Sequence, residues 1–224
     1  MARHILTAAL FGAAALAVAA PASAQSFLPT FSSDGDWLVR LRGIAVLPNE
    51  DVDSTNTPGL DVSIDDSVVP ELDISYFFTP NIAAELILGT TPHDVTGKGA
   101  IIPGANVGSV WLLPPTLTLQ YHVTQLGDWT GNEALSKVKP YVGAGLNYTI
   151  FYNEDAGQFA SVNYDNAFGY ALQAGVDFEL SEGIYLNVDA KYIFLDTDVT
   201  VNNAIRANVD INPLIIGVGL GARF

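Results

Sequence analysis

The 224-residue sequence contains no cysteine, so no disulfide bond can hold the chain together. It also lacks long apolar runs: beyond residue 20, no window offers the ~20 consecutive apolar residues that a transmembrane helix needs. Basic residues are scarce, with 9 Lys and Arg against 24 Asp and Glu. The resulting net charge of −15 argues against a nucleic-acid or polyanionic partner.

The N-terminus has the pattern of a secretory signal. Arg3 and His4 precede an apolar run over 5–20, and Ala22-Ser23-Ala24 has the small residues of a cleavage site. We therefore expect residues 1–24 to be a cleaved signal peptide and 25–224 to form one exported domain. An uncleaved anchor is the alternative, disfavoured because the run is short and Pro21 follows it.

The chain is 49% hydrophobic although no window could form a spanning helix. Alternation explains this combination, because a transmembrane β-barrel turns every second residue toward lipid. The final strand shows the pattern best: its apolar side alternates with glycines and Arg223, and Phe224 ends the chain. A terminal aromatic of this kind is expected at the periplasmic rim of a barrel.

Eight alternating segments can be counted, at 37–47, 69–78, 82–91, 115–123, 138–152, 167–179, 184–195 and 207–224. They predict an all-β protein, an eight-stranded antiparallel transmembrane β-barrel spanning the single domain 25–224. The links at 79–81 and 180–183 are short. The links at 49–68, 92–114, 153–166 and 196–206 are long and are expected to be external loops, with both termini in the periplasm. The link at 124–137 is an exception, since it is long but periplasmic.

A secreted soluble β-barrel or sandwich would also show alternation, with the apolar faces turned into a core. It is disfavoured because the charged residues share the opposite face and the aromatic rings gather at strand ends.

Several motifs resemble the OmpW family of small outer-membrane proteins: Pro114-Pro115-Thr116-Leu117-Thr118-Leu119-Gln120-Tyr121, the stretch 140–149, Ala84-Glu85-Leu86 and the closing 219–224. The resemblance implies an eight-stranded barrel in the outer membrane of a Gram-negative bacterium. It also implies a narrow, largely hydrophobic interior that carries small hydrophobic molecules, and no enzyme chemistry.

The inward-facing residues can be sorted by height in the barrel. Those near the outer end are apolar and are predicted to bind a hydrophobic ligand: Ile44, Val46, Ile87, Phe151, Ile193 and Leu195. Below them we expect a polar lumen floor: Arg40, Arg42, Glu85, Gln120 and Asp177. Unpaired charges in a narrow lumen are costly, so the arginines should pair with acids such as Glu85 or Asp177. The hypothesis is that a hydrophobic molecule enters from the outer end, is stopped by this floor and leaves sideways into lipid; alternatively, the apolar residues only fill the barrel.

A second class of function is a scaffold whose external loops act in adhesion or receptor binding, with Asn163 and Tyr164 as recognition residues. Catalysis is not expected, because His122 lies low in the lumen and His93 lies in a loop without a nucleophile beside it. No metal site or cofactor is expected either. The expected partners are outer-membrane lipid, a small hydrophobic ligand and the barrel-assembly machinery, which would contact the strand ending at Phe224.

Overall fold

A computed structural model describes residues 36–224. The predicted signal peptide lies outside the described residues and stays a prediction. The elements are β1 (Trp37–Leu47), β2 (Asp51–Thr55), β3 (Leu60–Ile64), β4 (Ser67–Phe77), β5 (Ile82–Gly89), β6 (Thr91–Gly99), β7 (Asn106–Leu113), β8 (Thr116–His122), α1 (Leu126–Thr130), η2 (Glu133–Lys137), β9 (Val138–Asp155), β10 (Val162–Tyr164), β11 (Ala167–Ser181), β12 (Ile184–Phe194), β13 (Asp196–Val201), β14 (Ile205–Asp210) and β15 (Leu214–Arg223).

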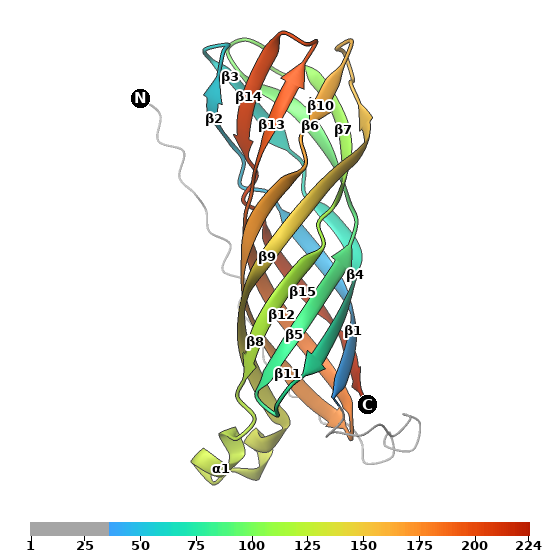
Figure 1. Cartoon of the computed structure of the whole chain (residues 1–224), viewed down its shortest axis with the longest axis vertical. Helices are drawn as coiled ribbons and strands as arrows, with labels where there is room; N and C mark the ends of the chain where they lie inside the picture. Colours follow the sequence, from blue (N-terminus) through green and yellow to red (C-terminus); the bar gives the residue numbers. More distant parts are fainter. Residues whose placement is uncertain (1–35) are drawn as a thin grey trace.

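Eight of these strands close into an antiparallel barrel, in the order β1, β4, β5, β8, β9, β11, β12 and β15 (Figure 1). The last strand returns to the first: Leu38 pairs with Arg223 at one end of the seam and Leu47 with Leu214 at the other. This closure confirms the predicted eight-stranded fold, and it leaves no unpaired sheet edge within the barrel.

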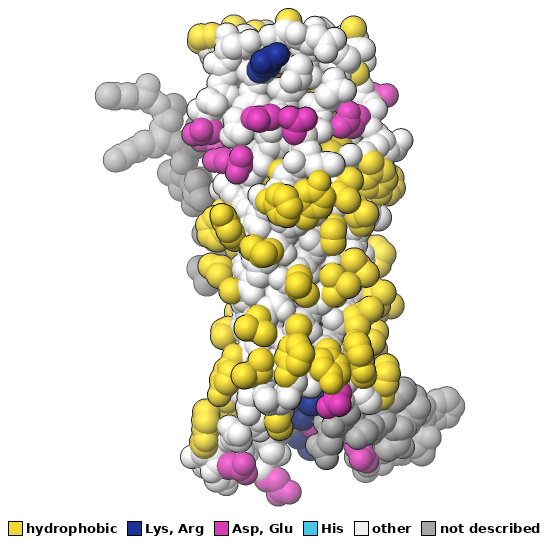
Figure 2. Space-filling model, in the orientation of Figure 1, with side chains coloured by type: hydrophobic (Ala, Val, Ile, Leu, Met, Phe, Trp, Pro, Cys, Tyr) yellow, Lys and Arg dark blue, Asp and Glu magenta, His cyan; other side chains and the backbone are white. Residues whose placement is uncertain are grey.

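The alternation read from the sequence separates the two faces of the wall. Leu119 is 61% exposed, whereas its neighbours Thr118 and Gln120 are each 1% exposed. Figure 2 shows the apolar side chains as a broad belt across the visible face of the barrel, with acidic side chains gathered above it. An apolar exterior and a charged interior are the reverse of a soluble core, as a barrel in hydrocarbon requires.

The long external links are not loops, and this corrects the sequence-based expectation. They contain β2 and β3, β6 and β7, β10, and β13 with the first part of β14, which extend the barrel wall outward. Above the barrel these strands form two sheets: β10, β13, β14 and β2 make one, and β3, β6, β7 and the outer part of β9 make the other. The barrel therefore continues as a walled space beyond the apolar belt (Figure 1).

The wall is interrupted where barrel and extension meet, because prolines there cannot donate a ladder hydrogen bond. Pro114 and Pro115 separate β7 from β8, and Pro213 precedes β15. Asparagine side chains replace part of the lost pairing. Asn212 Oδ1 accepts from Leu195 N at 3.0 Å, and Asn147 Nδ2 donates to Pro114 O at 3.2 Å.

The link at 124–137 lies at the opposite end of the molecule and folds into α1 and η2 (Figure 1). Neither helix, nor any other within residues 36–224, is long and apolar enough to cross a membrane.

The lumen has three layers. An apolar plug of Leu38, Phe77, Ala83 and Tyr185 closes the end near the chain's C-terminus. Charged and polar side chains fill the middle, and a larger apolar cluster, which includes Ile44, Phe151 and Ile193, lies toward the extension. The sequence predicted the upper two layers but not the plug.

Candidate functional site: two apolar chambers above a charged floor

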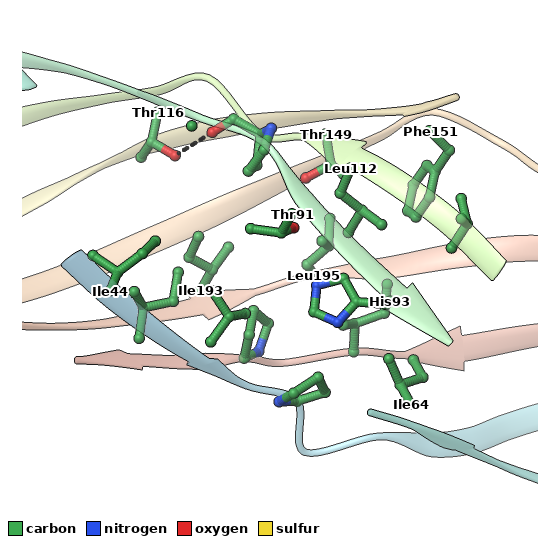
Figure 3. A pocket seen from close by; sticks show the side chains of 18 of the residues that line it. Ile44, Ile64, Thr91, His93, Leu112, Thr116, Thr149, Phe151, Ile193 and Leu195 are labelled. Atoms are coloured by element: carbon green, nitrogen blue, oxygen red, sulfur yellow. Dashed lines mark hydrogen bonds between the residues drawn. The ribbon is translucent and has the colours of Figure 1, made fainter. Parts of the chain in front are cut away.

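The apolar layer lines a cavity, named here the inner chamber. Its volume, counted as the space open to the centre of a water molecule, is about 50 Å³. All six residues predicted to bind a hydrophobic ligand line it: Ile44, Val46, Ile87, Phe151, Ile193 and Leu195. Figure 3 labels Ile44, Phe151, Ile193 and Leu195 among the lining side chains. A single water needs about 10–15 Å³ on this measure, so the chamber is open rather than packed solid. Ligand binding by these six residues stays a prediction.

A second cavity, the outer chamber, lies between the two sheets of the extension and offers about 60 Å³ on the same measure. Four side chains line both chambers: Ile64, Val95, Tyr164 and Ile211. The two cavities are therefore adjacent, and the ring formed by these four side chains lies between them. Tyr164, predicted as an external recognition residue, instead stacks on Phe151 with ring centroids 5.5 Å apart and planes at 14°.

The inner chamber ends at an ion pair. Lys191 Nζ lies 3.0 Å from Glu71 Oε2, and both side chains line the chamber while being 1% and 5% exposed. These two residues break the simple height order expected from the sequence. The register explains their place, because Glu71 pairs with Arg42 of the floor, whereas Lys191 pairs with Ile215, which pairs in turn with Val46 of the apolar lining.

Arg40 anchors the floor below. Its Nη2 lies 2.7 Å from Asp177 Oδ2, and its Nη1 lies 2.9 Å from Glu85 Oε1. The prediction that Arg40 pairs with these two acids is confirmed. Gln120 Nε2 donates to the second oxygen of Glu85 at 2.6 Å, so this predicted floor residue joins the same network.

Arg42 forms only a long ion pair with the expected Glu85 and pairs more closely with other acids. Its Nη2 lies 2.6 Å from Asp73 Oδ1 but 3.9 Å from Glu85 Oε1, and its Nη1 lies 3.3 Å from Asp189 Oδ1. Tyr141 adds a hydroxyl donor to Asp189 at 2.7 Å. Sequence reasoning missed Asp73 and Asp189 as partners because alternation gives the face of a residue but not its angular position in the barrel.

Five carboxylates thus face three cations in the lumen: Glu71, Asp73, Glu85, Asp177 and Asp189 against Arg40, Arg42 and Lys191. Buried charges are tolerated only when they are paired, and each of these eight side chains has an ion-pair partner within 3.3 Å. Nothing on this network resembles a metal site, since residues 36–224 hold no cluster of three or more potential ligands arranged around a cation. The floor and the plug together block passage straight through the barrel.

The side wall of the inner chamber is weakened between β4 and the strands β5 and β6. The β4–β5 ladder stops at Glu71 and Gly89, and the β3–β6 ladder begins at Ile64 and Val95. Between these points one backbone hydrogen bond, Asp65 N to Asp94 O at 3.0 Å, joins the two sides in the described chain. Pro70 and Pro92, one on each side, have no N–H to add another.

His93 and Thr91 of β6 also line the inner chamber. His93 was expected in a loop, but the structure places it on a strand with its side chain inward. The signal was available in the sequence, since Thr91, His93 and Val95 alternate with Pro92 and Asp94.

A closed eight-stranded barrel with an apolar exterior, a blocked polar lumen and an apolar outer cavity is the architecture of a small outer-membrane protein. The OmpW family model matches residues 33–224, and the chain belongs to the OmpW family. It is accordingly a protein of the outer membrane, embedded in the lipid bilayer.

Two relatives and one solved structure illustrate the similarity. An uncharacterized outer-membrane protein of Sinorhizobium fredii, y4mB, is 45% identical over 95% of this chain and 90% of its own length. The dibenzothiophene metabolism operon protein PahQ of Pseudomonas aeruginosa is 28% identical over 88% of this chain and 92% of its own. The crystal structure of outer membrane protein OprG from Pseudomonas aeruginosa superposes with a TM-score of 0.76 at 26% identity, covering 87% of this chain and 98% of that one.

Proposed function

We propose that this protein admits small hydrophobic molecules into the outer membrane. The observation that carries the proposal is the pair of adjacent apolar chambers, of which the outer lies in the extension and the inner ends on the Glu71–Lys191 ion pair. A hydrophobic molecule gains free energy by leaving water for such a space, roughly 25 cal/mol per Å² of apolar surface. The relative PahQ, named for dibenzothiophene metabolism, supports the same ligand class.

The route out of the inner chamber is sideways. Paired charges and the plug lie below the chamber, whereas the wall between β4 and β6 has lost most of its ladder. A molecule that has reached the inner chamber therefore passes through this weak wall into the lipid.

Uptake of dibenzothiophene by cells that express the protein tests the proposal. Expression should raise the initial rate above that of the empty strain, and Val95→Phe, which fills the ring between the chambers, should remove most of the gain. Val142→Phe is the matched control, because Val142 is 60% exposed on the lipid side and lines neither chamber. Equal uptake with and without the protein would contradict the proposed function.

The alternative of an adhesive scaffold stays a prediction without a structural observation in its favour. The segments expected to be external loops instead form strands that line the outer chamber. Contact between the strand ending at Phe224 and the barrel-assembly machinery likewise stays a prediction.

A further inference from the structure

Two polar side chains project into the otherwise apolar inner chamber from one strand. Thr91 and His93 are two residues apart on β6, so both point to the same face of the wall. Each is 4% exposed and each lines the chamber. Figure 3 shows them beside one another, directed toward the space around Leu195.

The proton on the His93 ring can be assigned from its partner. Nδ1 lies 2.7 Å from the backbone carbonyl oxygen of Asp65, which can only accept a hydrogen bond. Nδ1 therefore carries the hydrogen, and Nε2 of the neutral ring presents a lone pair. The bond also holds the ring against the junction of β3 and β4, at the weak side wall.

Nε2 of His93 and the Thr91 hydroxyl have no hydrogen-bond partner among residues 36–224. Both atoms are accessible from the chamber, because Thr91 and His93 line it and neither atom is fully buried. The other threonines of the chamber differ in this respect: Thr116 donates to Pro114 O, and Thr149 donates to Asn147 Oδ1. An unsatisfied buried polar group is unfavourable, so these two atoms favour a guest that can bond to them.

The geometry suits one small polar group. Thr91 and His93 are neighbours on one face of β6 and open onto the same cavity, so one bound molecule can offer a polar group to either side chain. A hydroxyl fits both atoms, since it donates to Nε2 and accepts from the Thr91 hydroxyl. A carboxylate is repelled by the Nε2 lone pair, and a hydrocarbon leaves both atoms without a partner.

We propose that Thr91 and His93 form a subsite for the hydroxyl group of an otherwise apolar ligand, such as a phenol or an alkanol, whose body lies against Phe151, Leu112 and Leu195. The inference rests on the proposed function and names its ligand class. Hydroxylated hydrophobic molecules are then bound beside the side exit and are favoured over hydrocarbons of the same shape.

The test compares p-cresol with p-xylene, which differ by a hydroxyl in place of a methyl group. Binding to the protein in lipid nanodiscs is measured by titration calorimetry, with protein-free nanodiscs subtracted. The wild-type protein should bind p-cresol about tenfold more tightly than p-xylene, and Thr91→Val and His93→Phe should each remove most of that preference while retaining p-xylene binding. Thr96→Val is the matched control, because Thr96 lies on the outer face of the same strand.

Equal affinities for the two compounds in the wild type would overturn the subsite while leaving the proposed function intact. A preference that survived in both variants would also overturn it, by placing the hydroxyl elsewhere. Absence of binding by either compound would overturn the proposed function and the subsite together. Folding is monitored separately by the urea midpoint, which Thr91→Val should not lower because the hydroxyl it removes has no partner.

Discussion

Arg40 and Asp177 form a bidentate ion pair across the lumen: Arg40 Nη2 lies 2.7 Å from Asp177 Oδ2, and Arg40 Nε lies 3.1 Å from Asp177 Oδ1. Their strands, β1 and β11, are not neighbours in the barrel, since β15 and β12 lie between them. The pair therefore ties opposite sides of the wall together through the interior, in the parallel geometry that makes Arg–carboxylate bonds strong.

Replacing Arg40 with methionine should lower the free energy of unfolding by about 3–5 kcal/mol, because Asp177 and Glu85 would be left buried with unbalanced charge. Urea unfolding in lipid vesicles measures the change. Arg206→Met is the control, since Arg206 is exposed on β14. A similar loss in both variants would show that the buried pairing contributes nothing specific.

Gly145 of β9 should not tolerate a methyl group. A Cβ there would lie 2.0 Å from the backbone oxygen of Leu117 on the neighbouring strand, so the two strands would have to move apart. Gly145→Ala should lose roughly 1–3 kcal/mol of stability, as overpacked sites do. Gly43→Ala should be neutral in the same unfolding assay, because nothing lies within 4 Å of a Cβ at that position.

The absence of cysteine makes single spin labels easy to place, and they test which face meets lipid. Labels at Leu119 and Val188, which are 61% and 41% exposed, should be relaxed strongly by oxygen dissolved in the bilayer. A label at Thr118 should be shielded, because Thr118 is 1% exposed and faces the lumen. Equal accessibility at Leu119 and Thr118 would contradict the orientation of the whole wall.

The purified protein should show no steady ionic conductance in a planar bilayer, since both the plug and the charged floor fill the lumen. Phe77→Ala should leave this unchanged, because the network above the plug still excludes ions. Phe77→Ala combined with Arg40→Ala should open a measurable current. A current in the wild type that was the same in the Phe77→Ala and double variants would mean that ions pass by another path.

Binding of p-cresol should depend on pH through His93, which lies on β6 outside the eight spanning strands. Burial lowers the pKa of His93 below its ordinary value of 6.5, partly opposed by the carbonyl of Asp65 and the carboxylates of Asp65, Asp66 and Asp94. The neutral ring is the form that accepts a hydrogen bond, so affinity should be constant above pH 6.5 and fall as pH drops below the lowered pKa. The charged or titratable groups that face His93 across the chamber are Glu71, Lys191 and Tyr164.

The affinity of p-xylene should stay flat over the same pH range. A parallel fall for both compounds would assign the effect to general distortion of the chamber.

Strand count, strand faces and the apolar upper lumen could all be read from the sequence, because period-two alternation is a strictly local signal. The inward direction of Ile193 and Lys191, for example, follows from their alternation with the residues next to them in the sequence. The pairing of Arg42 with Asp73 could not be read, since it depends on strand stagger, which the sequence does not state. The extension was missed for another reason: short segments such as Asp51–Thr55 carry a single apolar side chain, Val52, and that composition is typical of loops.

The plug of Leu38, Phe77, Ala83 and Tyr185 was not predicted, because in the sequence these residues lie near the ends of the expected strands, at the membrane boundary. Tyr164 was predicted as an external recognition residue rather than as part of the cavity wall, because its strand has only three residues. In both places, distant parts of the chain supply the packing partner, so no local pattern could reveal it.

The plug has a consequence for the cell that carries this protein. A barrel sealed at its inner end adds no aqueous leak, however many copies are present, so abundance is uncoupled from the escape of salts and the influx of water-soluble toxins. With the proposed function, such a barrel makes the envelope more receptive to oily compounds without making it more porous to water-soluble ones.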